Sequence, residues 1–539
     1  MLSTLSSFLR SPTSPTTSTR KLSTRTYEDA VTALNSLQSN AATLEAVRAS
    51  GGRLSQFAHP EMIEYLGRIG YRPEDLNTLN VLHITGTKGK GSTSAFCDAM
   101  LRKTVPTWKV GLYTSPHLVA VRERIRVNGE PISEDDFTRY FFEVWDRLQE
   151  NTTRKLAQTS LMPAYFRFMT LLAFHYFSSI KVDATILEVG VGGLYDSTNI
   201  VPKPIVTGIT SLGVDHTAVL GNTLKEIGYQ KGGIYKPGVP ALTVEQPEEG
   251  MNAIRDQAKA QKASSFTVVQ TMPELQNVKL GLSGAHQFQN ASLAVNLVHQ
   301  YLLARQPDIA ESLPSLYPTP LPPSYINGLE ATRFPGRCQE VADPEHTKIT
   351  WFLDGAHTIE SLTSCAEWFF QPTVGLKQSD ARTVISSKRQ RVLIFNCTSG
   401  RNGEKFLNVV LDGMKKRVLQ HQIDGGAELI ERGFFDHAIF CTNITYVDGR
   451  SKADLMNNTV DMDDLSKLKV QSELSQAWTK LVPDYPKNRI HVLPSVQHAI
   501  EVVHGLESAG HVDVLVAGSL HLVGGVIEVA GIGSVAMAT

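Results

Sequence analysis

Cysteine is scarce in this sequence. Five residues, Cys97, Cys338, Cys365, Cys397 and Cys441, are scattered over 539 positions without a Cys-x-x-Cys pair. This spacing argues against a disulfide scaffold and against a structural zinc site, and it fits a reducing compartment. An excess of one charge is also missing, because 52 Lys and Arg residues oppose 53 Asp and Glu residues. A general binder of nucleic acid or of anionic membranes would need a basic excess.

A long apolar run is absent as well. The richest stretch, Val512–Thr539, contains Asp513, Ser519, His521 and Glu528, so a buried strand and helix explain it better than a membrane span. Hydrophobic residues make up 42% of the chain and charged residues 19%, which supplies material for cores and argues against global disorder. At roughly 150 residues per domain, the length predicts two to four domains. We expect a soluble, intracellular enzyme.

Acidic residues are lacking from positions 1–27, whose basic side chains are Arg10, Arg20, Lys21 and Arg25. The segment is also rich in Ser and Thr, a composition typical of a mitochondrial transit peptide. A disordered tail is the alternative. We expect residues 1–27 to be a leader that directs the chain to the mitochondrial matrix. A cytoplasmic form would arise by incomplete import or from a start site outside this sequence.

Apolar strands and helical segments alternate along the remaining chain, which predicts parallel α/β architecture with ligands at the carboxyl ends of the strands. We expect a P-loop ATPase-like parallel-sheet domain over residues 28–333 and a Rossmann-like α/β domain over residues 334–539. A polar segment at about 445–487 predicts a surface insertion in the second domain. The expected helices are 27–72, 92–103 and 165–177, and the expected strands are 80–85, 109–113, 184–188, 205–209, 350–353, 392–396, 437–441, 489–493 and 513–517.

The first expected strand runs into a glycine-rich turn with the parts of a polyphosphate cradle. Glycines admit phosphate oxygens to the backbone N–H groups, a helix N-terminus adds partial positive charge, and a lysine neutralises the β/γ-phosphates. The turn departs from the standard pattern, because Ile84 replaces its first glycine and Gly91 its hydroxyl residue. Either Ser92 or another loop must then supply the hydroxyl that holds Mg²⁺. The residues of this turn are Gly86, Thr87, Lys88, Gly89, Lys90, Gly91 and Ser92.

Polar side chains follow the next three expected strands. Ser115 and His117 follow the second strand, Glu188 ends the third, and Asp215 and His216 follow the fourth. Three such groups beside a phosphate loop predict a Mg²⁺ shell, because Mg²⁺ takes few protein oxygens together with phosphates and water. Each residue alone would more often be an ordinary surface or core residue.

A series of motifs resembles folylpolyglutamate synthases of the Mur ligase superfamily, in the same order and over most of the chain. The run of arginines after Ser115-Pro-His-Leu and the sequence Asp354-Gly-Ala-His-Thr are most similar to those of eukaryotic members. The matching segments are Gly86–Ser92, Thr114–Val119, Val121–Arg126, Leu187–Asp196, Ser211–Thr217, Gln230–Gly238, Gly284–Asn290, Phe334–Arg337, Phe352–Thr358 and Gly518–Gly524.

The resemblance implies a role for each matching residue. Gly86–Ser92 would bind the ATP phosphates, with Lys90 as the phosphate-loop lysine. Lys231 matches a lysine that is carbamylated in relatives, and a carbamate on Lys231 would hold a second Mg²⁺. Lys90, Lys231 and His357 are the expected catalytic residues. The remaining assignments are Asn290, Arg337 and Asp354 for ATP, Ser115, Glu188 and His216 for Mg²⁺, and His117, Arg122, His357 and Ser519 for the folate and glutamate substrates. The segment Thr114–Arg126 resembles the mobile loop associated with folate binding.

The implied reaction is ATP-dependent addition of L-glutamate to the γ-carboxyl of a tetrahydrofolyl-(poly)glutamate through an acyl phosphate. ATP is a substrate, Mg²⁺ and a monovalent cation such as K⁺ are the implied ions, and a monomer is expected. Such an enzyme would retain folates in the cell and mitochondria for one-carbon metabolism. The alternatives are a dihydrofolate synthase or a bifunctional enzyme, then a P-loop kinase or ATPase, and last a noncatalytic folate or nucleotide carrier.

Overall fold

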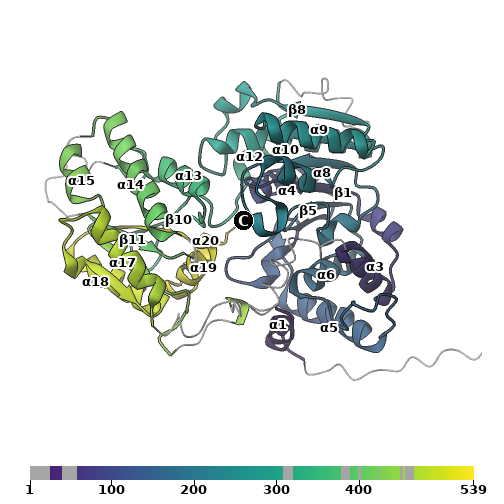
Figure 1. Ribbon diagram of the computed structural model, residues 1–539, viewed down its shortest axis with the longest axis horizontal. Coiled ribbons are helices and arrows are strands. Elements are labelled where there is room, and N and C mark those ends of the chain that lie inside the picture. The colour runs from purple at the N-terminus through teal and green to yellow at the C-terminus, as the bar shows by residue number, and fades with distance from the viewer. Residues whose placement is uncertain are drawn as a thin grey trace, which may run out of the picture.

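The computed structural model forms two bodies, each built on its own β-sheet (Figure 1). The C-terminal helices α19 (Leu520–Val529) and α20 (Gly533–Ala536) lie where the two bodies meet (Figure 1). The structure describes residues 25–38, 57–306, 320–377, 389–397, 402–423, 425–448, 453–455 and 467–538.

The first sheet has the strand order β4-β3-β2-β5-β1-β6-β7-β8, and all pairs except β2–β3 and β3–β4 are parallel. Ile84 of the central strand is in register with both Glu188 and Gly208. The carboxyl ends of three strands therefore meet at one edge. The strands are β1 (Val81–Thr85), β2 (Val110–Tyr113), β3 (Ile125–Val127), β4 (Glu130–Pro131), β5 (Ala184–Glu188), β6 (Val206–Ile209), β7 (Pro240–Val244) and β8 (Ser265–Val269).

Helices cover both faces of this sheet. One face carries α4, α10 and α12 around Leu82 and Ile84, and the other carries α1, α3, α5 and α6 around Val81. Helix α9 packs beside Ile209, and α8 packs on α9. The helices are α1 (Tyr27–Asn35), α3 (Ala58–Arg68), α4 (Lys90–Thr104), α5 (Glu134–Glu150), α6 (Tyr165–Ile180), α7 (Thr217–Leu220), α8 (Leu224–Gly232), α9 (Glu248–Ala260), α10 (His286–Arg305) and α12 (Pro323–Ala331).

The second sheet has the order β13-β12-β11-β14-β10-β9, and only the β9–β10 pair is antiparallel. Helices α13, α14 and α17 cover one face, and α18 and α19 cover the other. The elements are β9 (Gln339–Ala342), β10 (Ile349–Leu353), β11 (Gln390–Phe395), β12 (His437–Cys441), β13 (Ile490–Leu493), β14 (Val512–Ala517), α13 (Ile359–Phe369), α14 (Gly403–Gln420), α15 (Gly426–Arg432), α17 (Lys469–Leu481) and α18 (Val496–Leu506).

The expected α/β fold with two mainly parallel sheets is confirmed. The antiparallel strands β3, β4 and β9 and the parallel strands β7 and β8 were not expected from the sequence. The helical stretch expected over 27–72 is divided, since α1 ends at Asn35 and α3 begins at Ala58, and residues 39–56 lie outside the described residues. Among the described residues, no helix is long and apolar enough to cross a membrane.

The first described residues lie slightly before the expected end of the leader. Arg25 donates to Asp146 at 2.9 Å, and Thr26 forms a capping box with Asp29 at the start of α1. Tyr27 is the first residue of that helix. Residues 25–27, which we assigned to the leader, therefore belong to the fold, and residues 1–24 lie outside the described residues.

Part of the polar segment at about 445–487 belongs to the core of the second domain and not to a surface insertion. Residues 469–481 form helix α17, which packs on α14, β12 and β13. Its Leu474 and Trp478 are 1% and 0% exposed. Apolar residues at a spacing of four on an otherwise polar helix produce one buried stripe, which the polar composition obscured.

Trp478→Ala is expected to lower the free energy of unfolding by about 3–5 kcal/mol, because a large buried aromatic side chain is lost from the second domain. Urea denaturation measures the change. Gln476→Ala, on the exposed face of the same helix, is the matched control and should change stability little. Equal stability of the two variants would show that α17 is not part of the core.

Candidate active site

The phosphate loop Gly86–Ser92 joins the end of β1 to the start of α4. Gly86 and Gly89 have φ values of 151° and 89°. A Cβ on Gly86 would lie 1.8 Å from Thr210 Oγ1, and a Cβ on Gly89 would lie 2.2 Å from Asn290 Oδ1. Only glycine fits at these two positions. The turn therefore leads directly into a helix N-terminus, where backbone N–H groups favour an anion.

Three lysines gather at this loop. The carbonyl oxygen of Gly86 accepts hydrogen bonds from Lys90 Nζ at 3.1 Å and from Lys231 Nζ at 2.8 Å. Burial lowers the pKa of Lys90. Burial, and secondly the nearby Lys90 ammonium, lower the pKa of Lys231 well below its ordinary value. Lys88 Nζ lies 3.1 Å from Asp215 Oδ2. The charges of Lys88 and Lys90 suit a polyanionic ligand at this loop.

The contribution of the Lys88–Asp215 ion pair to the stability of the folded protein depends on pH. Burial favours protonation of Asp215, but the Lys88 ammonium and His216 together outweigh burial, and the pKa of Asp215 falls to about 2. Because the folded-state pKa lies below the unfolded value, the pair stabilises the folded protein above the ordinary carboxyl pKa. This stabilisation is lost as the pH falls towards about 2.

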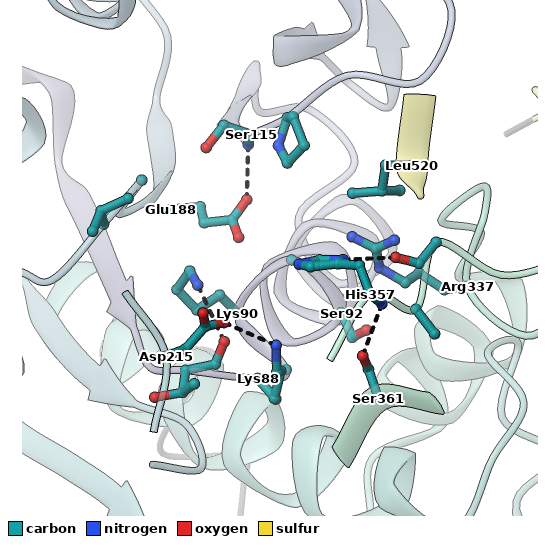
Figure 2. A pocket seen from close by; sticks show the side chains of 18 of the residues that line it. Lys88, Lys90, Ser92, Ser115, Glu188, Asp215, Arg337, His357, Ser361 and Leu520 are labelled. Atoms are coloured by element: carbon teal, nitrogen blue, oxygen red, sulfur yellow. Dashed lines mark hydrogen bonds and ion pairs between the residues drawn. The ribbon is translucent and has the colours of Figure 1, made fainter. Parts of the chain in front are cut away.

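The expected Mg²⁺ ligands lie at the same edge of the first sheet. Glu188 ends β5, and one of its oxygens accepts a hydrogen bond from Ser115 N at 2.9 Å. Figure 2 shows Glu188 between Ser115 and Lys90. Burial raises the pKa of Glu188, opposed by the Lys90 ammonium. His216 precedes α7 with φ 51°, and burial lowers its pKa.

A hydroxyl, a carboxylate and an imidazole thus face one space. Among the described residues, no three His, Cys, Asp or Glu side chains form a group that could hold a metal ion on their own. A Mg²⁺ ion at Ser115, Glu188 and His216 would not require a closed protein cage, because Mg²⁺ keeps phosphate oxygens and water among its ligands.

Residues of the second domain form the opposite wall. Asp354 accepts hydrogen bonds from Cys338 N and Ala356 N, both at 2.8 Å. His357 Nδ1 donates to the carbonyl oxygen of Gly355 at 2.8 Å. This contact fixes the ring, because a carbonyl oxygen can only accept.

The two walls enclose a cavity of about 640 Å³, a size that suits a small-molecule ligand. In Figure 2, Lys88, Lys90 and Glu188 of the first domain face Arg337 and His357 of the second. The predicted site residues that line the cavity are Thr87, Lys88, Gly89, Lys90, Gly91, Ser92, Ser115, Glu188, His216, Arg337, Asp354, His357 and Ser519.

Five predicted site residues do not line this cavity. Gly86 and Lys231 are bonded to each other beside the loop, and Asn290 lies directly behind Gly89. His117 is buried, and its Nε2 lies 2.7 Å from the carbonyl oxygen of Asp454. Arg122 is directed away and donates to Ile132 O at 3.3 Å.

The cavity also contains residues that the sequence analysis did not assign. Arg124, Asp196 and His521 line it, and each lies within one of the matched motifs, so that signal was available. Phe166 and Ser361 line it as well, and no motif indicated them.

Comparison with known proteins gives a consistent picture, although no family model matches the chain. A folylpolyglutamate synthase of Saccharomyces cerevisiae (strain FostersO) is 43% identical over 514 residues, which is 94% of this chain and 87% of that protein. The solved Mycobacterium tuberculosis folylpolyglutamate synthase complexed with ADP has a TM-score of 0.63 at 20% identity, covering 93% of this chain and 99% of that one.

A solved folylpolyglutamate synthase complex with AMPPCP and folate has a TM-score of 0.58 at 20% identity and covers 94% of this chain and 99% of that one. These structures share the fold, and the yeast relative shares sequence along nearly the whole length. The chain belongs to the folylpolyglutamate synthase family.

Proposed function

We propose that this chain is an ATP-dependent ligase that joins L-glutamate to the γ-carboxyl of tetrahydrofolyl-(poly)glutamates. One observation carries the proposal: the phosphate loop and the second-domain residues Asp354 and His357 line a single cavity. A nucleotide held by one wall and glutamate held by the other can therefore both reach an acceptor carboxylate in the same space. Family membership, and a neighbour whose complex contains AMPPCP and folate, support this choice of substrates.

The first step activates the carboxyl group, since a carboxylate is a poor acyl donor. A γ-carboxylate oxygen attacks the γ-phosphorus of ATP, the bond from that phosphorus to the bridging oxygen breaks, and ADP leaves. The product is an acyl phosphate. Lys90 and the loop N–H groups lower the repulsion between the two anions, which is the main requirement of phosphoryl transfer.

The second step forms the amide bond. The unprotonated amine of glutamate attacks the acyl carbon, and the tetrahedral intermediate expels phosphate with the electrons of the C–O bond. His357 is placed on the second-domain wall to orient the amine or to take its proton. With the nucleotide on one domain and glutamate on the other, closure of the domains would exclude water from the acyl phosphate.

The proposed Mg²⁺ ligands are Ser115 Oγ, the Glu188 carboxylate and the His216 imidazole. A bound Mg²⁺ would neutralise charge on the phosphate oxygens. A monovalent cation such as K⁺ is also proposed as a cofactor, and no residue is assigned as its ligand. The chain is further proposed to act as a monomer, which sedimentation at increasing concentration tests.

Lys231 is proposed to carry a carbamate. Its low pKa, due first to burial and then to Lys90, favours the neutral amine. That amine can bond to the carbon of CO₂ and lose a proton, giving an anionic oxygen ligand for a second Mg²⁺. In bicarbonate, native mass spectrometry is expected to detect the added mass of one CO₂. Lys231→Gln should lose this adduct, whereas Lys225→Gln, exposed on the same helix, should keep it; an adduct that survives in Lys231→Gln contradicts the assignment.

One assay tests the proposed function against its alternatives. Purified protein is incubated with MgATP, labelled glutamate and either tetrahydrofolate or dihydropteroate, and the product masses are measured by mass spectrometry. Glutamate addition to tetrahydrofolate is expected. Addition to dihydropteroate alone would identify a dihydrofolate synthase, and addition to both a bifunctional enzyme. ATP hydrolysis independent of glutamate and folate would favour an ATPase, and no turnover would favour a carrier.

The leader is proposed to send part of the protein to the mitochondrial matrix and to leave part in the cytoplasm. Removal of residues 1–24 would spare the contact of Arg25 with Asp146. Cell fractionation is expected to find the full chain in both compartments and the shortened chain in the cytoplasm alone. A full chain confined to the cytoplasm would contradict the proposal.

A further inference from the structure

A short helical turn of the second domain, η6 (Ala453–Leu455), lies against the first domain. In Figure 1 it is the short green segment beside α1, apart from the rest of the green and yellow body. The turn contacts α1 as well as α19. Its central residue, Asp454, is only 6% exposed. A carboxylate is buried to this degree only where donors surround it.

Asp454 accepts three hydrogen bonds from the first domain. Its Oδ1 accepts from the Tyr27 hydroxyl of α1 at 2.6 Å and from Val121 N at 2.7 Å. Its backbone carbonyl oxygen lies 2.7 Å from His117 Nε2. One residue of the second domain thus connects the first helix to the loop that contains residues 117–121.

The contact with His117 extends to the active-site cavity. Because the Asp454 carbonyl oxygen only accepts, the His117 proton lies on Nε2. His117 Nδ1 is then the acceptor for Arg124 Nε at 2.9 Å. The Arg124 guanidinium lies over the Tyr165 ring, 5.4 Å from its centroid, and lines the cavity. Asp454 thereby influences the position of a cation that faces the substrates.

The same loop is held by the second domain at another point. Leu118 is buried in the apolar core around α18 and α19. A Cβ added to Gly524 of α19 would lie only 1.9 Å from the Leu118 carbonyl oxygen, so the absence of a side chain at Gly524 allows this close contact. Within the loop, the Glu123 carboxylate accepts from the N–H groups of Leu118, Val119 and Ala120. The loop is therefore a compact unit, and its position depends on the second domain.

We propose that Asp454 is a positioning residue that ties this loop to the second domain and so sets Arg124 in the cavity for the anionic acceptor substrate. The identity of that substrate rests on the proposed function. Asp454 itself does not line the cavity. It acts through Val121, His117 and Arg124, so its loss should weaken binding of the acceptor more than it slows the chemical step.

Three variants test the proposal. Asp454→Ala removes both hydrogen bonds to the carboxylate and is expected to raise KM for tetrahydrofolate about tenfold. KM for ATP and kcat should change less. Asp454→Asn keeps an amide oxygen at the Oδ1 position and should restore nearly normal KM. Tyr27→Phe removes only the contact with α1 and should have the smaller effect.

A second measurement reports on the loop directly. Hydrogen exchange of the Val121 amide is expected to accelerate in Asp454→Ala and to stay slow in Asp454→Asn. Thermal unfolding confirms that each variant is folded. Unchanged exchange in Asp454→Ala overturns the proposal, and so does faster exchange with an unchanged KM for tetrahydrofolate. If the unmodified protein adds no glutamate to tetrahydrofolate, the proposed function fails instead, and exchange alone then decides whether Asp454 holds the loop.

Discussion

Lys90→Ala is expected to lower the rate of glutamate ligation by about 10²–10³-fold or more, because the cation that faces the transferred phosphoryl group is lost. In the structure Lys90 Nζ donates to carbonyl oxygens of its own loop, Gly86 O at 3.1 Å and Thr87 O at 3.5 Å. Both acceptors lie in the phosphate loop itself. The measurement is incorporation of labelled glutamate at saturating MgATP and tetrahydrofolate.

The stability of this variant should change in the opposite direction. Burial lowers the pKa of Lys90, so the folded protein without nucleotide disfavours the charged side chain. Lys90→Ala is therefore expected to unfold at the same temperature or a higher one. Lys103→Ala, exposed on the same helix, controls for loss of a lysine. Near-normal incorporation by Lys90→Ala would defeat the assignment of the phosphate loop.

Glu188→Gln is expected to have the second largest effect, a loss of turnover of about 10²-fold or more at Mg²⁺ concentrations that saturate the unmodified enzyme. Glutamine preserves the shape of the side chain and can still accept from Ser115 N, which lies 2.9 Å from Glu188 Oε2. Only the negative charge is removed. The change therefore tests the charge of the Mg²⁺ site rather than its packing.

Titration of turnover with Mg²⁺ separates the possible causes for Glu188→Gln. A requirement for more Mg²⁺ is expected, together with unchanged or increased thermal stability, because burial raises the pKa of Glu188 and disfavours its charge. Glu249→Gln, exposed on α9, is the control. Wild-type turnover of Glu188→Gln at limiting Mg²⁺ would remove Glu188 from the proposed metal site.

The central strands could be predicted because each is a short apolar run whose position depends on its own residues. Residues 184–188 and 437–441 were expected as strands with the observed bounds. The strands β3 and β9 could not be predicted in this way. They are short and antiparallel, and their pairing depends on a neighbour rather than on a local pattern.

The sequence by itself determined the phosphate loop, since glycines, a lysine and a helix start act within seven adjacent residues. It also determined which strand ends carry polar side chains, because strand direction fixes where those residues lie. The tertiary structure alone decided that Phe166 and Ser361 line the same cavity and that Asp454 reaches His117 across the two domains. Contacts of this kind join residues up to 427 positions apart, as with Tyr27 and Asp454. They follow from the packing of whole helices and sheets, which no local segment encodes.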